Sequence, residues 1–172
     1  MNKFVVMAPR NVGKTTLVKK VLETTVRKTG GYYTQLYKGS SETEDKHCPV
    51  YIAPIGKEII PDEDHCVSPI IEGRRTVNPE AFDKFGVEYL TVSDKDTLII
   101  MDEVGFLERK AEKFKAKIFE VLASENPVLI MVKERDNIDY INRIKDFPGV
   151  TFYHMNEENR DEVFREIIKE LS

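Results

Sequence analysis

The chain has 172 residues, of which 41% are hydrophobic and 33% are charged, and its formal net charge is −4. This length and composition predict one globular domain over residues 1–172 with a core of ordinary size. The negative charge gives no global attraction to nucleic acid or to an anionic membrane, and no apolar run approaches the roughly 20 residues that span a bilayer. The apolar run at residues 4–8 is too short for a secretory signal, so we expect a cytoplasmic location and no membrane partner.

Short apolar runs and amphipathic segments alternate along most of the sequence. The strands are predicted at 3–7, 32–37, 97–101, 127–132 and 150–153, and the helices at 14–28, 79–91, 108–124, 136–145 and 157–171. We expect Gly30-Gly31 to end the first helix. This alternation predicts an α/β fold of three layers, in which a mostly parallel sheet carries helices on both faces. In such sheets, ligands bind beyond the carboxyl ends of the strands.

The segment 38–76 interrupts this alternation. Residues 38–47 are polar and indicate an exposed loop, and residues 61–65 indicate a turn. Between them, residues 48–60 are predicted to form a β-hairpin whose turn lies near Ile55-Gly56-Lys57. The segment therefore reads as a β-rich excursion that is too short to be a separate domain.

Nine residues that follow the first predicted strand and open the first predicted helix have the spacing of the P-loop pattern for phosphate binding. They are Ala8, Pro9, Arg10, Asn11, Val12, Gly13, Lys14, Thr15 and Thr16. Ala8 stands where the pattern usually has its first glycine, and alanine there is a mild departure because the strand exit needs a small residue. The context of a strand before and a helix after the motif argues against a chance match.

Each residue type in this loop suits the binding of a nucleoside triphosphate. Gly13 permits a tight backbone turn, so that successive N–H groups converge at the positive end of a helix. Lys14 supplies a cation for the β- and γ-phosphates, and the Thr15 hydroxyl is a predicted ligand of Mg²⁺. Thr16 is expected to bond an α-phosphate oxygen. We therefore predict Mg²⁺ as the cofactor and a nucleoside triphosphate, such as ATP or GTP, as the substrate.

A second acidic element follows the apolar run at 97–101. Asp102 and Glu103 come directly after it, as in a Walker B element. Asp102 is the predicted second Mg²⁺ ligand, and Glu103 is the predicted catalytic group that orients or deprotonates the attacking water. Two charged residues at a solvent-exposed strand end are the plainer interpretation, which the P-loop upstream makes less attractive. An acid directly after the Walker B aspartate suggests, by analogy of fold, the core strand order 5-1-4-3-2.

Several basic residues are candidates for phosphate or base contacts. Arg75, next to Arg74 in a predicted loop, is a candidate for stabilising transition-state charge, although a solvated pair is an equal alternative. Arg135 follows a strand and is either a phosphate sensor or an ordinary charge at a helix start. Asn159 and Arg160 follow the last strand, where base contacts are common; the alternative is a helix start with Asn156 as its N-cap.

Two His-Cys pairs, His47-Cys48 and His65-Cys66, invite a zinc hypothesis. Cysteine and histidine are the ligands that tetrahedral zinc favours. However, adjacent side chains on a strand point to opposite faces, and the sequence has no C-x-x-C spacing. Buried or partly exposed thiols are therefore the default expectation, and the role of these four residues is left open.

Several of these segments together resemble a known family. The P-loop, Gly30-Gly31-Tyr32-Tyr33-Thr34, Asp102-Glu103-Val104-Gly105-Phe106-Leu107-Glu108 and Glu158-Asn159-Arg160-Asp161 occur in an order similar to that of the thermophile-type, or cancer-related, nucleoside-triphosphatases. The resemblance covers nearly the whole chain and implies a P-loop NTPase fold. It also implies hydrolysis of ATP, GTP and other nucleotides with modest base selectivity. The sequence departs from the family pattern at Gln35, at Phe106-Leu107 and over residues 38–68.

Three functions follow from these observations. The leading hypothesis is a nucleoside triphosphate phosphohydrolase in which Lys14, Glu103 and a nearby arginine act on the γ-phosphate. A nucleoside or nucleotide kinase is the first alternative. It needs an acceptor pocket, for which the 38–76 segment with Tyr32, Tyr33 and Tyr37 is the candidate lining, but the sequence shows no arginine-rich lid. A nucleotide-dependent switch without turnover is the second alternative. The base preference, the oligomeric state and the source of the arginine, from the same or another subunit, are not determined by the sequence.

Overall fold

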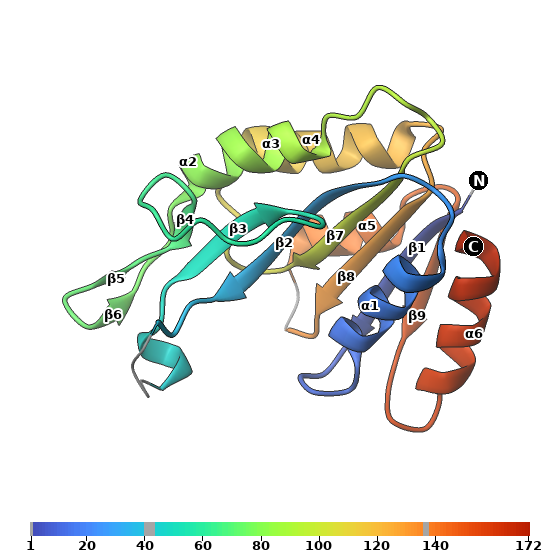
Figure 1. Cartoon of the computed structure of the whole chain (residues 1–172), viewed down its shortest axis with the longest axis horizontal. Helices are drawn as coiled ribbons and strands as arrows, with labels where there is room; N and C mark the ends of the chain where they lie inside the picture. Colours follow the sequence, from blue (N-terminus) through green and yellow to red (C-terminus); the bar gives the residue numbers. More distant parts are fainter. Residues whose placement is uncertain (1, 40–43, 136–137) are drawn as a thin grey trace.

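A seven-stranded sheet forms the centre of the computed structural model, which describes residues 2–39, 44–135 and 138–172 (Figure 1). Its parallel part has, in spatial order, the strands β2 (Thr29–Leu36), β7 (Leu98–Val104), β8 (Val128–Lys133), β1 (Lys3–Ala8) and β9 (Val150–His154). Read in chain order, these are strands 2-3-4-1-5. The core order 5-1-4-3-2 predicted from the acidic pair is therefore confirmed.

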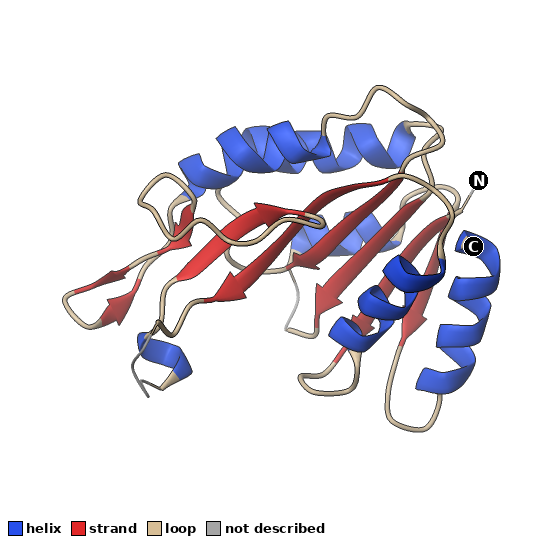
Figure 2. Ribbon diagram, viewed as in Figure 1, coloured by secondary structure: helices blue, strands red, loops and turns tan. Residues whose placement is uncertain are grey.

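Helices cover both faces of this sheet, which confirms the predicted three-layer α/β architecture. On one face lie α1 (Lys14–Thr24) and α6 (Arg160–Leu171), which run side by side in front of the sheet in Figure 1. On the other face lie α4 (Glu112–Ala123), α5 (Asp139–Lys145) and a helical segment at residues 79–90. Figure 2 shows the same three layers with the strands in red.

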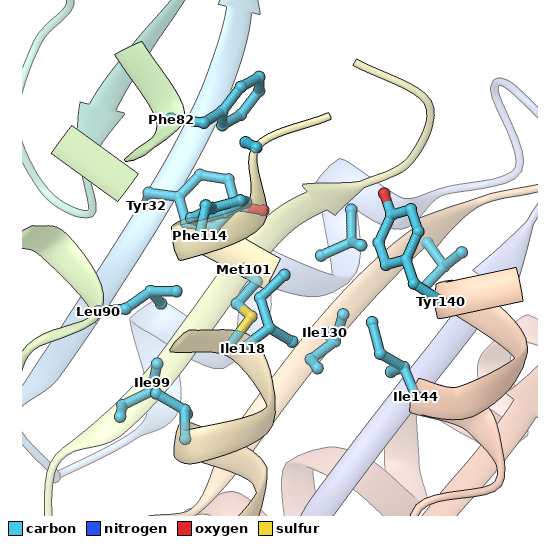
Figure 3. Packing of buried hydrophobic residues seen from close by; sticks show 14 of the residues in the cluster. Tyr32, Phe82, Leu90, Ile99, Met101, Phe114, Ile118, Ile130, Tyr140 and Ile144 are labelled. Carbon is cyan, nitrogen blue, oxygen red and sulfur yellow. The ribbon is translucent and has the colours of Figure 1, made fainter. Parts of the chain in front are cut away.

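Two hydrophobic clusters hold these layers together, one on each face of the sheet. Alternate residues of the buried strands divide between them: Ile100 packs with α1 and α6, whereas Ile99 and Met101 pack with α4 and α5. This is the period of two that a strand imposes on its side chains. On the α4 side, Phe114 meets Tyr32 edge-on at 5.3 Å and Phe82 at 5.2 Å between ring centroids (Figure 3).

The excursion after β2 extends the sheet with antiparallel strands. β3 (Val50–Pro54) pairs with β2, and β4 (Cys66–Ser68) pairs with β3. Short elements flank them: the 3-10 turn η1 (Asp45–His47) and the two-stranded ribbon of β5 (Ile70–Ile71) and β6 (Arg74–Arg75). The predicted loop at 38–47 lies partly outside the described residues, at 40–43.

The predicted second arm of the hairpin, at residues 58–60, is wrong. The strand that pairs with β3 is β4, because Val67 is completely buried in the core whereas Ile60 is 55% exposed. Pro61 directly follows the predicted arm and has no N–H to give to a strand partner. The turn near residues 55–57 is present, with the N–H of Lys57 donating to the carbonyl of Pro54 at 3.1 Å.

The prediction that Gly30-Gly31 ends the first helix is also wrong, because the pair lies inside β2. α1 ends at Thr24, and β2 begins at Thr29. A side chain at Gly31 would place its Cβ 1.9 Å from the carbonyl oxygen of Ile100, and the residue has φ of 103°. Close approach to β7 is therefore the reason for this glycine.

Other predicted helices are confirmed with shifted ends. The helix expected at 79–91 is a run of α2 (Pro79–Ala81), a π-helical turn η2 (Phe82–Gly86) and α3 (Val87–Leu90). α4 starts at Glu112, four residues after the prediction, and α6 starts at Arg160, three residues after it. The helix predicted from residue 136 is α5 from Asp139, and residues 136–137 lie outside the described part of the chain.

Candidate functional site

The predicted phosphate loop connects β1 to α1 at the carboxyl edge of the sheet. Ala8, the last residue of β1, is completely buried, so that this position has room only for a small side chain. The backbone then turns through Asn11, with φ of 64°, and Gly13, with φ of 123°. Asparagine and glycine are the residues that adopt positive φ most readily. α1 begins at Lys14, immediately after this turn, with Thr15 and Thr16 exposed in its first turn.

Lys14 lies inside this loop and reaches the acidic strand beside it. Its Nζ donates to the carbonyl of Ala8 at 2.8 Å and lies 3.9 Å from Oε2 of Glu103. The Lys14 side chain is only 11% exposed. Burial lowers the pKa of Lys14, whereas the negative charges of Glu103 and Asp102 act to raise it. The structure thus brings the predicted cation and the predicted catalytic carboxylate to the same place.

Asp102 and Glu103 lie within β7 rather than after it, because the strand continues to Val104. In a regular strand, two successive side chains point to opposite faces of the sheet. Here the pairing of β7 with β8 shifts by one residue between Asp102 and Val104, which leaves Glu103 as the extra residue of a bulge. Bulges redirect a side chain, and both carboxylates are close enough to affect the pKa of Lys14.

The environment of Asp102 is unfavourable for a carboxylate. Burial, together with the neighbouring charge of Glu103, raises the pKa of Asp102 to about 6, and Lys14 acts in the opposite direction. A bound divalent cation would relieve this cost. A carboxylate and the Thr15 hydroxyl are hard oxygen donors of the kind that Mg²⁺ prefers, with its other positions filled by water and phosphate oxygens. The residues present therefore fit Mg²⁺.

A buried network holds the loop that follows β7. Glu108 is 2% exposed, and its Oε1 is within hydrogen-bond distance of the Gly105 N–H and, at 2.8 Å, of the Tyr140 hydroxyl. The same hydroxyl also contacts the carbonyl of Gly105. Burial raises the pKa of Glu108 to about 7, against the hydrogen bonds from Gly105 and Tyr140, which favour the carboxylate. This network fixes the segment that leads directly out of the Asp102-Glu103 pair.

The sequence did not point to this network. Glu108 belongs to the segment that resembles the family, and the predicted helix at 108–124 places it at a helix start, whereas α4 begins at Glu112. The only feature of the sequence that points to Glu108 is its place in the segment Asp102–Glu108, five residues after Glu103. Tyr140 gave no signal, since it is separated from Glu108 by 32 residues.

The start of α6 packs against the phosphate loop. The guanidinium of Arg160 donates to the carbonyl of Val12 at 3.4 Å, and a Cβ on Gly13 would lie 3.4 Å from the ring of Phe164. Asn159 donates from Nδ2 to the carbonyl of His154 at the end of β9. The structure thus places Arg160 beside the phosphate loop, and Asn159 directly precedes Arg160 in the chain. Asn156, predicted as the N-cap of this helix, instead accepts from the N–H groups of Glu158 and Asn159 in the preceding turn.

Arg75 is not brought to the phosphate loop by any of its hydrogen bonds within the described residues. Its Nη2 donates to the carbonyls of Asp45 and Cys48, each at 2.7 Å, and its Nη1 donates to Ser68 Oγ at 3.2 Å. These contacts tie β6 to the turn η1. The catalytic role predicted for Arg75 therefore gains no support from the geometry, which gives the side chain a structural task.

Arg10, in the phosphate loop, reaches the same turn from the other side. Its Nη2 lies 2.7 Å from Oδ2 of Asp45, which also pairs with Lys38 at 2.6 Å. The two cations lower the pKa of Asp45. The excursion after β2 thus contacts the phosphate loop through Asp45.

The His-Cys pairs do not assemble a zinc site. His65 pairs with Asp62 at 2.6 Å and stacks on Phe85 at 4.0 Å between ring centroids, and the Cys48 thiol contacts the carbonyl of Glu44. Both cysteines are buried. In the described ranges of the chain, no group of three or more His, Cys, Asp and Glu side chains is arranged to hold a metal ion. Arg135, predicted to be either a phosphate sensor or a charge at a helix start, lies over the ring of Phe106, 4.9 Å from its centre.

The phosphate loop, the acidic strand beside it and the strand order together define a P-loop protein of the kind that binds nucleoside triphosphates. Of the helices in the described part of the chain, none combines the length and apolar character needed to cross a bilayer. The sequence model of a family described as NTPase matches residues 3–168. The chain therefore belongs to this NTPase family, which confirms the resemblance seen in its motifs.

Individual relatives agree with this assignment. The chain is 31% identical to the nucleoside-triphosphatase THEP1 of Thermotoga petrophila over 168 residues, which cover 96% of this chain and 90% of the relative. Two solved structures share the fold. The crystal structure of THEP1 from Aquifex aeolicus has a TM-score of 0.75 at 22% identity and 99% coverage of both chains. The solution structure of a human cancer-related nucleoside triphosphatase has a TM-score of 0.67 at 17% identity, covering 98% of this chain and 96% of its own.

Proposed function

We propose that this NTPase hydrolyses ATP, GTP and other nucleoside triphosphates to the diphosphate and phosphate, with Mg²⁺, at the phosphate loop formed by residues 8–16. The observation that carries the proposal is the contact between Lys14 and Glu103: Nζ of Lys14 lies 3.9 Å from Oε2 of Glu103. A cation for the transferring phosphoryl group and a carboxylate for the attacking water thus face the same space. Both are needed for hydrolysis and neither suffices alone.

Each residue of the site then has a defined task. The N–H groups of the loop and Lys14 bind the β- and γ-phosphates and carry the charge that builds up as the bond to the γ-phosphorus breaks. Glu103 orients a water molecule for attack on the γ-phosphorus and accepts its proton. Thr15 and Asp102 would hold Mg²⁺, which neutralises phosphate charge when it is bound.

Arg160 is the basic residue that the geometry favours for a further contact with the nucleotide. Its guanidinium donates to the carbonyl of Val12, so that it already lies against the phosphate loop. Asn159, the residue before it, is the matching candidate for a polar contact with the base or the ribose. Arg75 is left out of this scheme because its hydrogen bonds go to Ser68 and to the turn η1.

The test is phosphate release from ATP, GTP, CTP and UTP with Mg²⁺ by wild type and by Glu103→Gln. The variant keeps the shape of the side chain and removes its charge, so it should bind Mg²⁺ and nucleotide and lose at least about 100-fold in hydrolysis. Glu120→Gln is the matched control, because Glu120 is an exposed glutamate on α4 that pairs with Lys117. Its rate should equal that of wild type.

Three outcomes would contradict the proposal. Unchanged hydrolysis in Glu103→Gln would mean that another group activates the water. Negligible release by wild type, with phosphorylated product appearing only when nucleosides or nucleoside monophosphates are added, would make the protein a kinase. Nucleotide binding without release under either condition would instead indicate a switch.

A further inference from the structure

A pocket of about 920 Å³ opens next to the loop that follows β7, on the face of the sheet covered by α4 and α5. Its walls come from this loop, from Arg135 after β8, from the first turn of α4, and from α5 with the residue that precedes it. No described residue that lines it belongs to the phosphate loop or to the Asp102-Glu103 pair. α1 and α6, which flank the phosphate loop, lie on the opposite face of the sheet (Figure 1). The volume is in the range that proteins use for ligands of nucleotide size.

The pocket is strongly basic in a chain whose net charge is −4. One acidic side chain, Asp139, lines it together with five cationic ones: Arg109, Lys110, Lys115, Arg135 and Arg143. Among the residues that the structure describes, only Lys115 of these five has a carboxylate within 4.0 Å, namely that of Glu112 at 2.9 Å. This excess of positive charge in one concave place favours an anionic ligand, and clustered arginines recognise phosphate through paired N–H donors.

The same pocket also offers surfaces for a flat ring. Phe106 is 38% exposed, although it is a large apolar residue. The guanidinium of Arg109 lies 3.5 Å from the centre of its ring, and that of Arg135 lies 4.9 Å from it. Phenylalanine rings and guanidinium planes are the groups on which nucleobases stack. Ile138 adds an apolar contact beside them. A ligand that combines a planar base with phosphate matches both properties of the pocket.

We propose that this pocket binds a second nucleotide, separate from the one at the phosphate loop, with its base at Phe106 and its phosphate among the arginines and lysines. A nucleoside monophosphate is better suited to this pocket than it is to the phosphate loop. The loop gains most of its contacts from β- and γ-phosphates, which a monophosphate lacks.

The pocket is also connected to the acidic pair. Tyr140 lines the pocket, and its hydroxyl contacts Gly105 and Glu108 in the segment that follows Asp102-Glu103. A nucleotide in the pocket therefore changes the rate of NTP hydrolysis, because it bears on the residues that fix this segment. This second part rests on the proposed hydrolysis, whereas the binding itself does not.

The binding test uses AMP, GMP, CMP and UMP as probes in isothermal titration with the wild-type protein and with Lys14→Ala. At least one monophosphate should bind with a dissociation constant below about 1 mM, and Lys14→Ala should leave this binding unchanged. Arg135→Glu combined with Arg143→Glu should weaken it by at least about tenfold, because two cations become repulsive anions. Adenosine and inorganic phosphate, each carrying half of the AMP molecule, should bind more weakly than AMP.

The control for charge is Lys28→Glu combined with Lys95→Glu, which changes the net charge equally at the amino end of the sheet. These two lysines are exposed and pair with Asp94 and Glu125. Binding should survive in this control. If the reversed arginine pair fails to fold, as judged by circular dichroism, the neutral pair Arg135→Gln and Arg143→Gln replaces it, with the same expected direction.

Three results would overturn the proposal. They are the absence of binding by all four monophosphates, equal binding to the arginine variant, and binding of inorganic phosphate as tight as that of AMP, which would remove the role of the base. The link to hydrolysis is tested separately with Tyr140→Phe, which should bind the monophosphate normally but show no change of ATP hydrolysis when it is added. If the wild-type protein does not hydrolyse nucleoside triphosphates, only the proposed link to hydrolysis fails, and the binding test is unaffected.

Discussion

The buried carboxyl of Glu108 makes a sharp prediction about stability and pH. In the folded protein its pKa stands at about 7 instead of the ordinary 4.5. The folded state therefore binds the proton more tightly than the unfolded state. The contribution of Glu108 to stability is most favourable below about pH 4.5 and becomes steadily less favourable as the pH rises to about 7. Each pKa unit corresponds to about 1.4 kcal/mol, so the loss amounts to about 3 kcal/mol.

Glu108→Gln removes this titration while keeping the size of the side chain and a carbonyl oxygen for the Gly105 N–H. The free energy of unfolding of the variant, relative to wild type, should therefore increase by about 3 kcal/mol between about pH 4.5 and about pH 8. For a chain of this length that corresponds to roughly 6–12 °C in melting temperature. Comparing the two pH values cancels any constant cost of the amide in the network.

The assay is urea unfolding of both proteins across this pH range. Glu80→Gln is the control, since Glu80 is exposed on α2 and its replacement removes one carboxylate from the surface and none from the core. If the difference between Glu108→Gln and wild type is independent of pH, Glu108 is ionised in the folded protein. The hydrogen bonds from Gly105 and Tyr140 would then outweigh burial, and the reasoning would be refuted.

Three further predictions concern the site and the sheet. Lys14→Ala should reduce phosphate release by at least about 100-fold, because the loop loses the cation that carries phosphoryl charge; steady-state release at saturating nucleotide measures this, and activity near that of wild type would rule out the site. Gly31→Ala should yield little folded protein, because its Cβ meets the Ile100 carbonyl at 1.9 Å, whereas Gly30→Ala meets only side chains, at 3.2 Å or more, and should melt within a few degrees of wild type. Arg75→Ala should cost about 1–3 kcal/mol in urea unfolding and change kcat by less than about threefold; a loss near 1000-fold would restore its catalytic role.

The sequence predicted the parallel core and the phosphate loop because their signals are local. The buried strands are continuous apolar runs, and the P-loop pattern specifies a strand before it and a helix after it. The strand order then followed from the position of one acidic residue. These features depend on residues within about ten positions of each other, which a single sequence displays.

The errors arose where a partner distant in the sequence decides the structure. Residues 58–60 and β4 have similar local patterns, and the burial of Val67 under α2 and η2 selects β4 as the partner of β3. The Gly30-Gly31 pair has the composition of a helix end, yet the carbonyl of Ile100 on the neighbouring strand explains it.

The unexpected parts of the site have the same origin. Glu108 and Tyr140 meet across 32 residues, and two of the acceptors of Arg75 lie 27 and 30 residues before it. Lys3, predicted simply as part of a strand, is buried and donates to carbonyls at the end of α4, 118 or more residues away. No local pattern predicts such contacts, because each depends on the packing of complete elements.

The central place of β1 in the sheet determines when the protein becomes able to bind nucleotide during its synthesis. β1 pairs with β8 and β9, near the other end of the chain, and Gly13 is packed by Phe164 of the final helix. Asn2 is likewise tied to the carbonyl of Glu170. The phosphate loop is synthesised before these partners and therefore acquires its shape only after residues 150–171 have emerged. Chains released early would expose an unsupported β1 and bind no nucleotide, and late contacts between distant segments slow folding.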